Sequence, residues 1–272
     1  MKAKFSPCFK PLILVTALAM TANVHSAETT DKVSVKKPWA FDLTAYLWLP
    51  SIDGNFTTDR FETSTSPSFI DIAGQMRNFP MAFNGHFNAH YERLGFYLDG
   101  NYMGMDFRPQ VNKGESKGVS TRMGIMEYGA SYRLLGQTAS ERVSNWSENP
   151  RSYSFDIYAG ARTIWLGNKA EFARLSVSSD KSVTAPVLGG RVMVDISPKW
   201  YVLVDGSVGG FGVDKVNFTS SALGTIGYRT HLFDVPASVE AGYKALSVKV
   251  NRPDLTSDIT MHGPYVGLTG YW

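Results

Sequence analysis

The sequence predicts an all-β protein, a transmembrane antiparallel up-and-down β-barrel of about ten strands. Three observations carry this prediction: apolar and polar side chains alternate over long segments, aromatic residues bracket the apolar face, and short turns alternate with longer polar stretches. Side chains of a strand repeat with period two, so the alternation indicates strands with two different faces. The segments run for about 11–16 residues, whereas strands of soluble proteins average ~5–6, and such long strands suit a bilayer.

Composition and charge exclude several classes of protein. Of the 272 residues, 43% are hydrophobic and 19% are charged, which excludes a disordered chain. The single cysteine excludes a disulfide scaffold and a cysteine-rich zinc module. The net charge of +3 comes from Lys2, Lys4 and Lys10, and without these three the 24 acidic residues are balanced. A neutral chain without a basic run is not expected to bind nucleic acid.

The first 27 residues have the layout of a secretory signal peptide. The three lysines precede a short apolar run, Leu12–Met20, and small residues follow as far as Ala27. Cleavage after Ser26 and cleavage after Ala27 both fit this layout. We expect a cleaved signal peptide at 1–27, a periplasmic tail at 28–38 and a barrel at 39–272. No apolar run reaches the ~20 residues of a spanning helix, so the expected location is the outer membrane of a Gram-negative bacterium, which barrels cross.

Alternating faces define the strands in the order of the chain. The residues expected on the apolar faces are Phe83, Phe87 and Tyr91; Leu94, Phe96 and Leu98; Met126, Tyr128 and Tyr132; Phe155, Ile157 and Trp165; Leu188, Val192 and Val194; Trp200, Val202 and Val204; Ile226, Tyr228 and Leu232; Val239, Ala241 and Tyr243. The predicted strands are 39–49, 79–92, 94–106, 118–134, 152–177, 182–196, 199–212, 216–232, 236–249 and 257–272. A break at Gly167, or pairing within 52–60, would make twelve strands.

Turns and loops complete this assignment, because short periplasmic turns alternate with longer outer loops in such barrels. Short turns are expected at Glu92–Gly95, Ser197–Lys199 and Phe233–Pro236, and a longer polar connection at Gly136–Arg151. The expected outer loops are 50–78, 107–117, near 178–182, near 213–215 and 250–257. The first of these is long enough to hold a short helix at Phe69–Met76.

Aromatic residues and the last strand indicate a membrane-spanning surface. The aromatic residues expected to bracket the apolar face are Trp39, Trp48, Trp165, Trp200 and Trp272. The final strand ends on Trp272, and Pro264, Val266 and Leu268 share its face. We expect these four residues to form the membrane-insertion signal of the barrel.

Three sequence segments resemble a largely uncharacterised family of proteobacterial outer-membrane barrel proteins. They are AYLWLPSIDGNF (45–56), FGVD after a glycine pair (209–214) and TMHGPYVGL (260–268). The resemblance covers about 39–272 and implies the fold and the outer-membrane location. It implies no catalytic residues.

The polar faces should line the lumen. The expected lumen-lining residues are His86, His90, Glu92, Asp99, Glu127, Arg133, Asp156, Arg162, Arg191, Asp195, Asp205, Arg229, His231, Glu240 and Lys244. In a barrel only slightly wider than eight strands, such mixed charges pair and fill the interior, which gives a structural role. A wider lumen would make the same residues the lining of a narrow passive pore for small solutes. Both readings leave the core of the protein polar.

An enzyme that modifies lipids, either an acyl hydrolase or an acyltransferase, is the alternative function. Ser131, Ser207 or Ser238 would supply a hydroxyl and Asp205 an acid, although no G-x-S-x-G motif is present. We expect no enzyme activity, no catalytic residues and no cofactor. His262 on the last strand is expected to mark the outer interface.

No metal site is expected either. His86 and His90 stand four residues apart, which on a strand separates them by roughly 13 Å, too far to share one ion. A single-ion site would need His231 or Glu92 from other strands. The expected partners are outer-membrane lipids and, during export, the barrel-assembly machinery and periplasmic chaperones. The barrel is expected to be a monomer.

Overall fold

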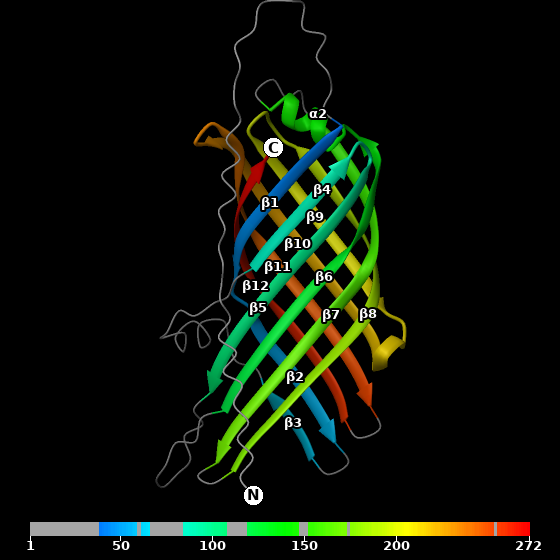
Figure 1. Cartoon of the computed structure of the whole chain (residues 1–272), viewed down its shortest axis with the longest axis vertical. Coiled ribbons are helices and arrows are strands. Elements are labelled where there is room, and N and C mark those ends of the chain that lie inside the picture. Colours follow the sequence, from blue (N-terminus) through cyan, green and yellow to red (C-terminus); the bar gives the residue numbers. More distant parts are fainter. Residues whose placement is uncertain are drawn as a thin grey trace, which may run out of the picture. The chain divides into compact units, whose positions relative to one another are not determined.

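The computed structural model describes residues 38–58, 61–65, 84–107, 119–146, 152–172, 175–252 and 255–272. Ten antiparallel strands close into a barrel (Figure 1). They are β1 (Trp39–Trp48), β4 (Asn84–Tyr91), β5 (Leu94–Phe107), β6 (Val119–Gly136), β7 (Tyr153–Phe172), β8 (Leu175–Asp195), β9 (Trp200–Gly210), β10 (Val216–Leu232), β11 (Val235–Arg252) and β12 (Leu255–Tyr271). Each strand pairs with the next, and β1 pairs with both β12 and β4 to close the ring. The predicted antiparallel barrel of ten strands is confirmed.

Several predicted features lie outside the described residues. These features are the signal peptide at 1–27, nearly all of the tail at 28–38, the helix at Phe69–Met76 and the start of the strand 79–92. They stay predictions.

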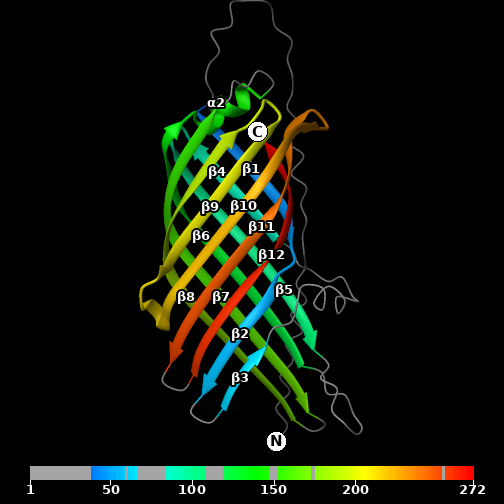
Figure 2. The same ribbon diagram turned by 180° about the vertical axis from the view of Figure 1, so that it is seen from behind.

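The segment predicted as the loop 50–78 holds a β-hairpin, formed by β2 (Ser51–Thr58) and β3 (Phe61–Thr65). β12 pairs with β1 as far as Tyr265 and then with β2 from His262 onward. Pro50 lies between β1 and β2, where a residue without an N–H interrupts the ladder. Pairing within 52–60 is therefore observed. The hairpin extends one end of the barrel instead of adding two strands to its wall (Figure 2).

The two ends of the barrel carry different elements. The β2 end carries the hairpin of β2 and β3. The α2 end is the opposite one, where helix α2 (Ala139–Ser144) and Trp272 lie (Figure 1).

Short turns join the strands at the α2 end where the sequence predicted them. They lie at Glu92–Arg93, around Pro198 and at Phe233–Asp234. Phe233 and Asp234 have φ angles of 50° and 65°, the left-handed pair that a type I′ hairpin turn requires. At the β2 end, the 3₁₀ helix η1 (Val213–Lys215) occupies the loop predicted near 213–215.

The predicted boundary between the fifth and sixth strands is wrong. β7 continues through Gly167 to Phe172, and β8 begins at Leu175, so the loop expected near 178–182 lies within β8. Lys169 pairs with Ser178 there. The polar composition of this segment resembles a loop, yet antiparallel pairing uses backbone groups and needs no apolar side chains. The loop at 250–257 is shortened in the same way, because β11 continues to Arg252 and β12 begins at Leu255.

The connection Gly136–Arg151 contains α2, which the sequence analysis did not predict. The Thr138 hydroxyl accepts a hydrogen bond from the Glu141 N–H at 3.2 Å, and the Glu141 carboxylate accepts one from the Thr138 N–H at 3.0 Å. This reciprocal capping box follows from the spacing Thr138-x-x-Glu141, which was the available signal. Among the described residues, no helix has the length and apolarity needed to cross a bilayer.

The outer surface of the barrel is apolar. Phe96, Ile157 and Val204 are each more than two-fifths exposed there, as their place on the predicted apolar faces requires. The exposed tryptophans are Trp39, Trp165, Trp200 and Trp272. On β12, Val266 and Leu268 are also exposed and Pro264 is half-buried, and the role of this face in membrane insertion stays a prediction.

The placement of Trp48 on the apolar outer face was wrong. Its side chain is fully buried inside the barrel, and its indole N–H donates to the Lys244 carbonyl oxygen at 3.2 Å. Period two explains this position, because Trp48 shares its face with Thr44 and Tyr46, which also point inward.

The interior has two layers of different character. Toward the β2 end, inward side chains form an apolar layer that is continuous across neighbouring strands: Met103 pairs with Met123, Ile125 with Ile164, and Ile164 with Val183. Toward the α2 end, the inward side chains are polar or charged. The expectation of a polar core throughout is therefore wrong for the half near the β2 end. There the strands carry apolar side chains on both faces, so alternation of polarity disappears.

Candidate functional site in the barrel lumen

A cavity of about 160 Å³ occupies the polar half of the interior and reaches the apolar layer at Ile125 and Leu246. Inward side chains from all ten barrel strands line it, together with Ala139, Arg142 and Val143 of α2. A single water molecule needs only about 10–15 Å³ of cavity volume, so this cavity has room for a small solute.

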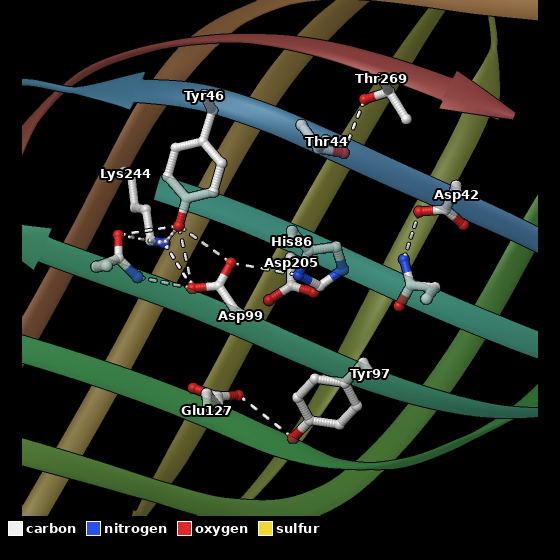
Figure 3. A network of polar contacts seen from close by, with 12 residues as sticks. Asp42, Thr44, Tyr46, His86, Tyr97, Asp99, Glu127, Asp205, Lys244 and Thr269 are labelled. Atoms are coloured by element: carbon white, nitrogen blue, oxygen red, sulfur yellow. Dashed lines mark hydrogen bonds and ion pairs between the residues drawn. The ribbon is translucent and has the colours of Figure 1, made fainter. Parts of the chain in front are cut away.

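Asp99 on β5 is the centre of the first polar cluster (Figure 3). The Tyr46 hydroxyl donates to both oxygens of Asp99 at 3.0 Å, and the Asn101 amide donates to Oδ1 at 2.7 Å. Lys244 Nζ lies 3.3 Å from Oδ1, and His86 Nδ1 lies 3.2 Å from Oδ2. Four strands, β1, β4, β5 and β11, therefore meet at one carboxylate.

Arg162 on β7 is the centre of the second cluster. Its guanidinium forms an ion pair with Glu127 at 2.6 Å, and it donates to the hydroxyls of Thr219, Ser207 and Ser221 at 2.6–2.9 Å. The residue is only 2% exposed. A buried charge is tolerated when its partner and its hydrogen bonds are both present, and Arg162 has both.

A third ion pair adjoins the Asp99 cluster. Arg191 Nε lies 2.8 Å from Asp205, which also accepts a hydrogen bond from the Tyr158 hydroxyl at 2.8 Å. The far side of the Arg191 guanidinium lies 3.4 Å from His86 Nε2. His86 thus joins the Asp99 cluster to the Arg191 pair.

Two arginine–aspartate pairs lie closer to the α2 end. Arg133 binds Asp156 through two parallel hydrogen bonds of 2.7 and 2.9 Å. Arg229 binds Asp195, and its guanidinium also lies 5.5 Å from the centre of the Trp146 ring. Both pairs are buried, and the Arg133–Asp156 pair has the planar geometry that suits arginine and carboxylate.

The segment that follows α2 packs across this end of the lumen. The indole N–H of the buried Trp146 donates to the Thr230 carbonyl oxygen on β10 at 3.1 Å. Its ring lies 4.7 Å from the ring of Tyr271 on β12. Since α2 is connected to β6 and contacts β1, the segment reaches across the ring and narrows the mouth at the α2 end.

Thirteen of the fifteen residues expected in the lumen point inward. Eleven line the cavity: His86, His90, Asp99, Glu127, Arg133, Asp156, Arg162, Arg191, Asp205, Glu240 and Lys244. Asp195 and Arg229 are buried beside it. Glu92 and His231 do not belong to this set, because both are exposed at hairpin turns of the α2 end, where alternation no longer places a side chain inside.

The sequence analysis missed three important residues of the lumen. Asp42 and Tyr46 line the cavity from β1, and they were missed because Trp48, which shares their face by period two, was placed outside. Arg142 lies on α2, and no strand pattern could have placed it inside.

The two histidines on β4 bind different carboxylates. His86 lies 3.2 Å from Asp99, whereas His90 lies 3.7 Å from Asp42, which also accepts a hydrogen bond from Asn88 at 2.7 Å. In the part of the chain that the structure describes, no three His, Cys, Asp or Glu side chains gather as metal ligands.

The serines proposed for a lipid-modifying enzyme have other partners. Ser207 binds Arg162 and Ser221, and Ser238 binds the hydroxyls of Tyr201 and Tyr271. Among the described residues, no hydrogen bond joins Ser131, Ser207 or Ser238 to a histidine.

Comparison with known proteins shows no family for this chain. No family model matches the chain, and no curated protein matches it, so the resemblance to a proteobacterial barrel family stays a prediction. Solved structures that match include the outer membrane protease OmpT of Escherichia coli, with 10% identity over 90% of this chain and all of that chain, at a TM-score of 0.48.

Two further solved structures match the chain. Ail, the attachment invasion locus protein of Yersinia pestis, crystallised with the heparin analogue sucrose octasulfate, has 11% identity over 86% of this chain and 98% of that chain, at a TM-score of 0.38. Neisserial surface protein A has 10% identity over 86% and 97%, at a TM-score of 0.31. With identities below 25% and TM-scores below 0.5, these three matches assign no function to this chain.

Proposed function

We propose that the chain is an integral outer-membrane β-barrel of a Gram-negative bacterium, with a structural role and a lumen that does not conduct. A closed ring of strands leaves no unpaired edge, which is the condition for crossing a bilayer with strands. The exposed apolar outer surface and its tryptophans support contact with lipid. The signal-peptide layout of residues 1–27 supports export.

The apolar layer is the observation that most directly supports a closed lumen. Met103, Met123 and Ile164 are each at most 7% exposed, although they point into the interior of the barrel. A hydrophobic constriction excludes water and therefore ions, so it blocks conduction even where a polar cavity lies below it. This layer favours the structural role over the narrow passive pore for small solutes.

The partners in this proposal follow from the location. Outer-membrane lipids would contact the apolar surface, and the barrel-assembly machinery and periplasmic chaperones would deliver the chain. The closed ring needs no second copy, so the barrel would be a monomer.

Two measurements test the proposal. First, the purified protein in detergent should migrate differently on a gel with and without boiling, and it should show strand-type circular dichroism. Second, the same protein in a planar lipid bilayer should give no conductance steps. Equal migration of the boiled and unboiled samples, together with a helical spectrum, would contradict the membrane barrel. Regular steps of conductance would contradict the structural role and support the narrow pore.

A lipid-modifying enzyme is the second candidate, because one polar cluster faces outward. The Tyr243 hydroxyl lies 2.6 Å from His262 Nδ1, and His262 Nε2 lies 3.1 Å from Asp53 on β2. Tyr243 is 51% exposed on the outer surface, so a hydroxyl, an imidazole and a carboxylate meet where lipid would reach them. His262 was expected only to mark the outer interface.

The enzyme candidate predicts a change in lipid composition. Expression of the intact protein in a deletion strain should alter the acylation of lipid A or phospholipids, and His262→Gln should abolish that change. Identical lipid profiles in the deletion, wild-type and overexpressing strains would eliminate this candidate.

A further inference from the structure

One cation of the cavity wall has no carboxylate partner. Among the described residues, Arg133, Arg162, Arg191 and Lys244 each form an ion pair with a carboxylate, whereas Arg142 of α2 forms none. Arg142 is nevertheless only 6% exposed. Its guanidinium contacts the Met193 sulfur and lies 3.4 Å from the Ser152 hydroxyl, and its Nε has no hydrogen-bond partner.

One carboxylate of the same wall has no cationic partner. Glu240 on β11 is 7% exposed, and within the described part of the chain no lysine, arginine or histidine lies within ion-pair distance of it. Its Oε1 accepts hydrogen bonds from the hydroxyls of Tyr201 at 2.7 Å, Thr269 at 3.0 Å and Ser238 at 3.3 Å. None of these bonds uses Oε2, which leaves that oxygen for another donor.

Both groups line the half of the cavity that α2 covers. Ser238, which binds Glu240, also binds the Tyr271 hydroxyl at 3.0 Å, and the Tyr271 ring packs against Trp146 just after α2. Arg142 and Glu240 both contribute to the wall of the cavity of about 160 Å³. The apolar side chains of Met193 and Leu203 form another part of the same wall.

Buried charges without partners are costly, and a ligand that supplies the opposite charges removes that cost. We propose that the cavity binds a small zwitterion of the α-amino acid class, with its carboxylate on Arg142 and its ammonium group on Glu240. Arginine suits a carboxylate because its planar fork can bind both oxygens. The carboxylate oxygen of Glu240 that no hydroxyl occupies can accept from an ammonium group.

The charge state of Arg142 agrees with this assignment. Burial, followed by the neighbouring charge of Arg133, lowers the pKa of Arg142 to about 10. The guanidinium therefore remains protonated at neutral pH and can hold an anionic group.

Three probes of nearly equal size separate the two charges of the ligand. L-alanine carries both groups, propionate lacks the ammonium group, and ethylamine lacks the carboxylate. Calorimetric titration of the folded barrel in detergent should show binding of L-alanine, with propionate and ethylamine each at least about tenfold weaker, since each loses one charged contact.

Variants assign the contacts. Arg142→Gln and Glu240→Gln should each weaken L-alanine binding about tenfold or more, and Arg142→Lys should recover part of the loss. Lys249→Gln is the matched control, because Lys249 forms an exposed ion pair with Asp258 away from the cavity. The affinity of this variant for L-alanine should equal that of the wild type. Gel mobility with and without boiling verifies that each variant is folded. If Arg142→Gln fails to fold, Glu240→Gln still tests the site, because its amide oxygen can accept the hydrogen bonds of the three hydroxyls.

Three outcomes would overturn the site. They are absence of L-alanine binding to the folded wild-type barrel at about 10 mM, equal binding of propionate, and unchanged affinity in both glutamine variants. Each outcome is independent of the proposed function, because gel mobility and bilayer conductance are measured without any ligand.

Discussion

The two halves of the lumen use the same ten strands but are stabilised in different ways. Toward the α2 end, Arg162 and Asp99 each bind a specific counterpart, whereas among the described residues Arg142 and Glu240 have none. Toward the β2 end, Met123, Ile164 and Val183 fill the interior by close packing alone. The polar half therefore depends on individual partners, whereas the apolar half depends on volume. The difference also divides the functions, because only the polar half can recognise a solute and only the apolar half can exclude water.

The largest expected effect comes from removing the central cation of the polar half. Arg162→Leu leaves the partly buried Glu127 without its cation, and the loss of one partner of a buried pair costs about 3–5 kcal/mol in the free energy of unfolding. Urea unfolding of the barrel in detergent, followed by tryptophan fluorescence, measures this loss.

A charge pair on the exterior is the control for this prediction. Lys249 and Asp258 lie 2.8 Å apart, but the two side chains are 54% and 36% exposed, so Lys249→Ala should cost only about 0–1 kcal/mol. If Arg162→Leu cost no more than Lys249→Ala, the polar network would not stabilise the barrel.

An intermediate effect is expected in the apolar half. Leu246→Ala removes a side chain that is 4% exposed and pairs across the sheet with Met261, and it leaves a cavity that costs about 2–5 kcal/mol. The same urea titration gives the value. Val239→Ala on the outer face of β11, where the side chain is 48% exposed, should cost clearly less. Equal costs at the two positions would show that the layer is not packed.

The smallest of the three effects belongs to the joint between β1 and β2. A Cβ atom at Gly263 would overlap the Leu49 carbonyl oxygen, so Gly263→Ala should force a local shift that costs about 1–3 kcal/mol. Gly224→Ala is the control, because no atom lies within 4 Å of a Cβ at that position. Amide exchange of β2 should accelerate in the first variant only, and unchanged exchange there would contradict the close contact.

Period two predicted the wall of this barrel and the polar half of its interior, but not the apolar half. Alternation gave the direction of side chains such as Asp99, Arg162 and Phe96, and the turn residues gave most hairpins, because both are local properties of the chain. The depth of a residue along the barrel axis is not a local property of the chain. The apolar layer became visible only when Met103 was found opposite Met123 on the neighbouring strand.

Two other features of the interior lay outside the strand pattern. Arg142 enters the lumen from α2, whose capping box Thr138-x-x-Glu141 was in the sequence but was not used. The unpaired state of Arg142 and Glu240 depends on every neighbouring side chain, so no linear motif could have indicated that site.

Water access along one strand tests the division of the lumen most directly. Met123 and Ser131 are both on β6, and Ser131 lines the cavity while Met123 belongs to the apolar layer. Single cysteines at the two positions, in a chain without Cys8, are treated with a small charged thiol reagent in detergent. Because the apolar layer excludes water, Ser131→Cys should react at least about tenfold faster than Met123→Cys. Equal rates at the two positions would contradict a dry layer and a closed lumen.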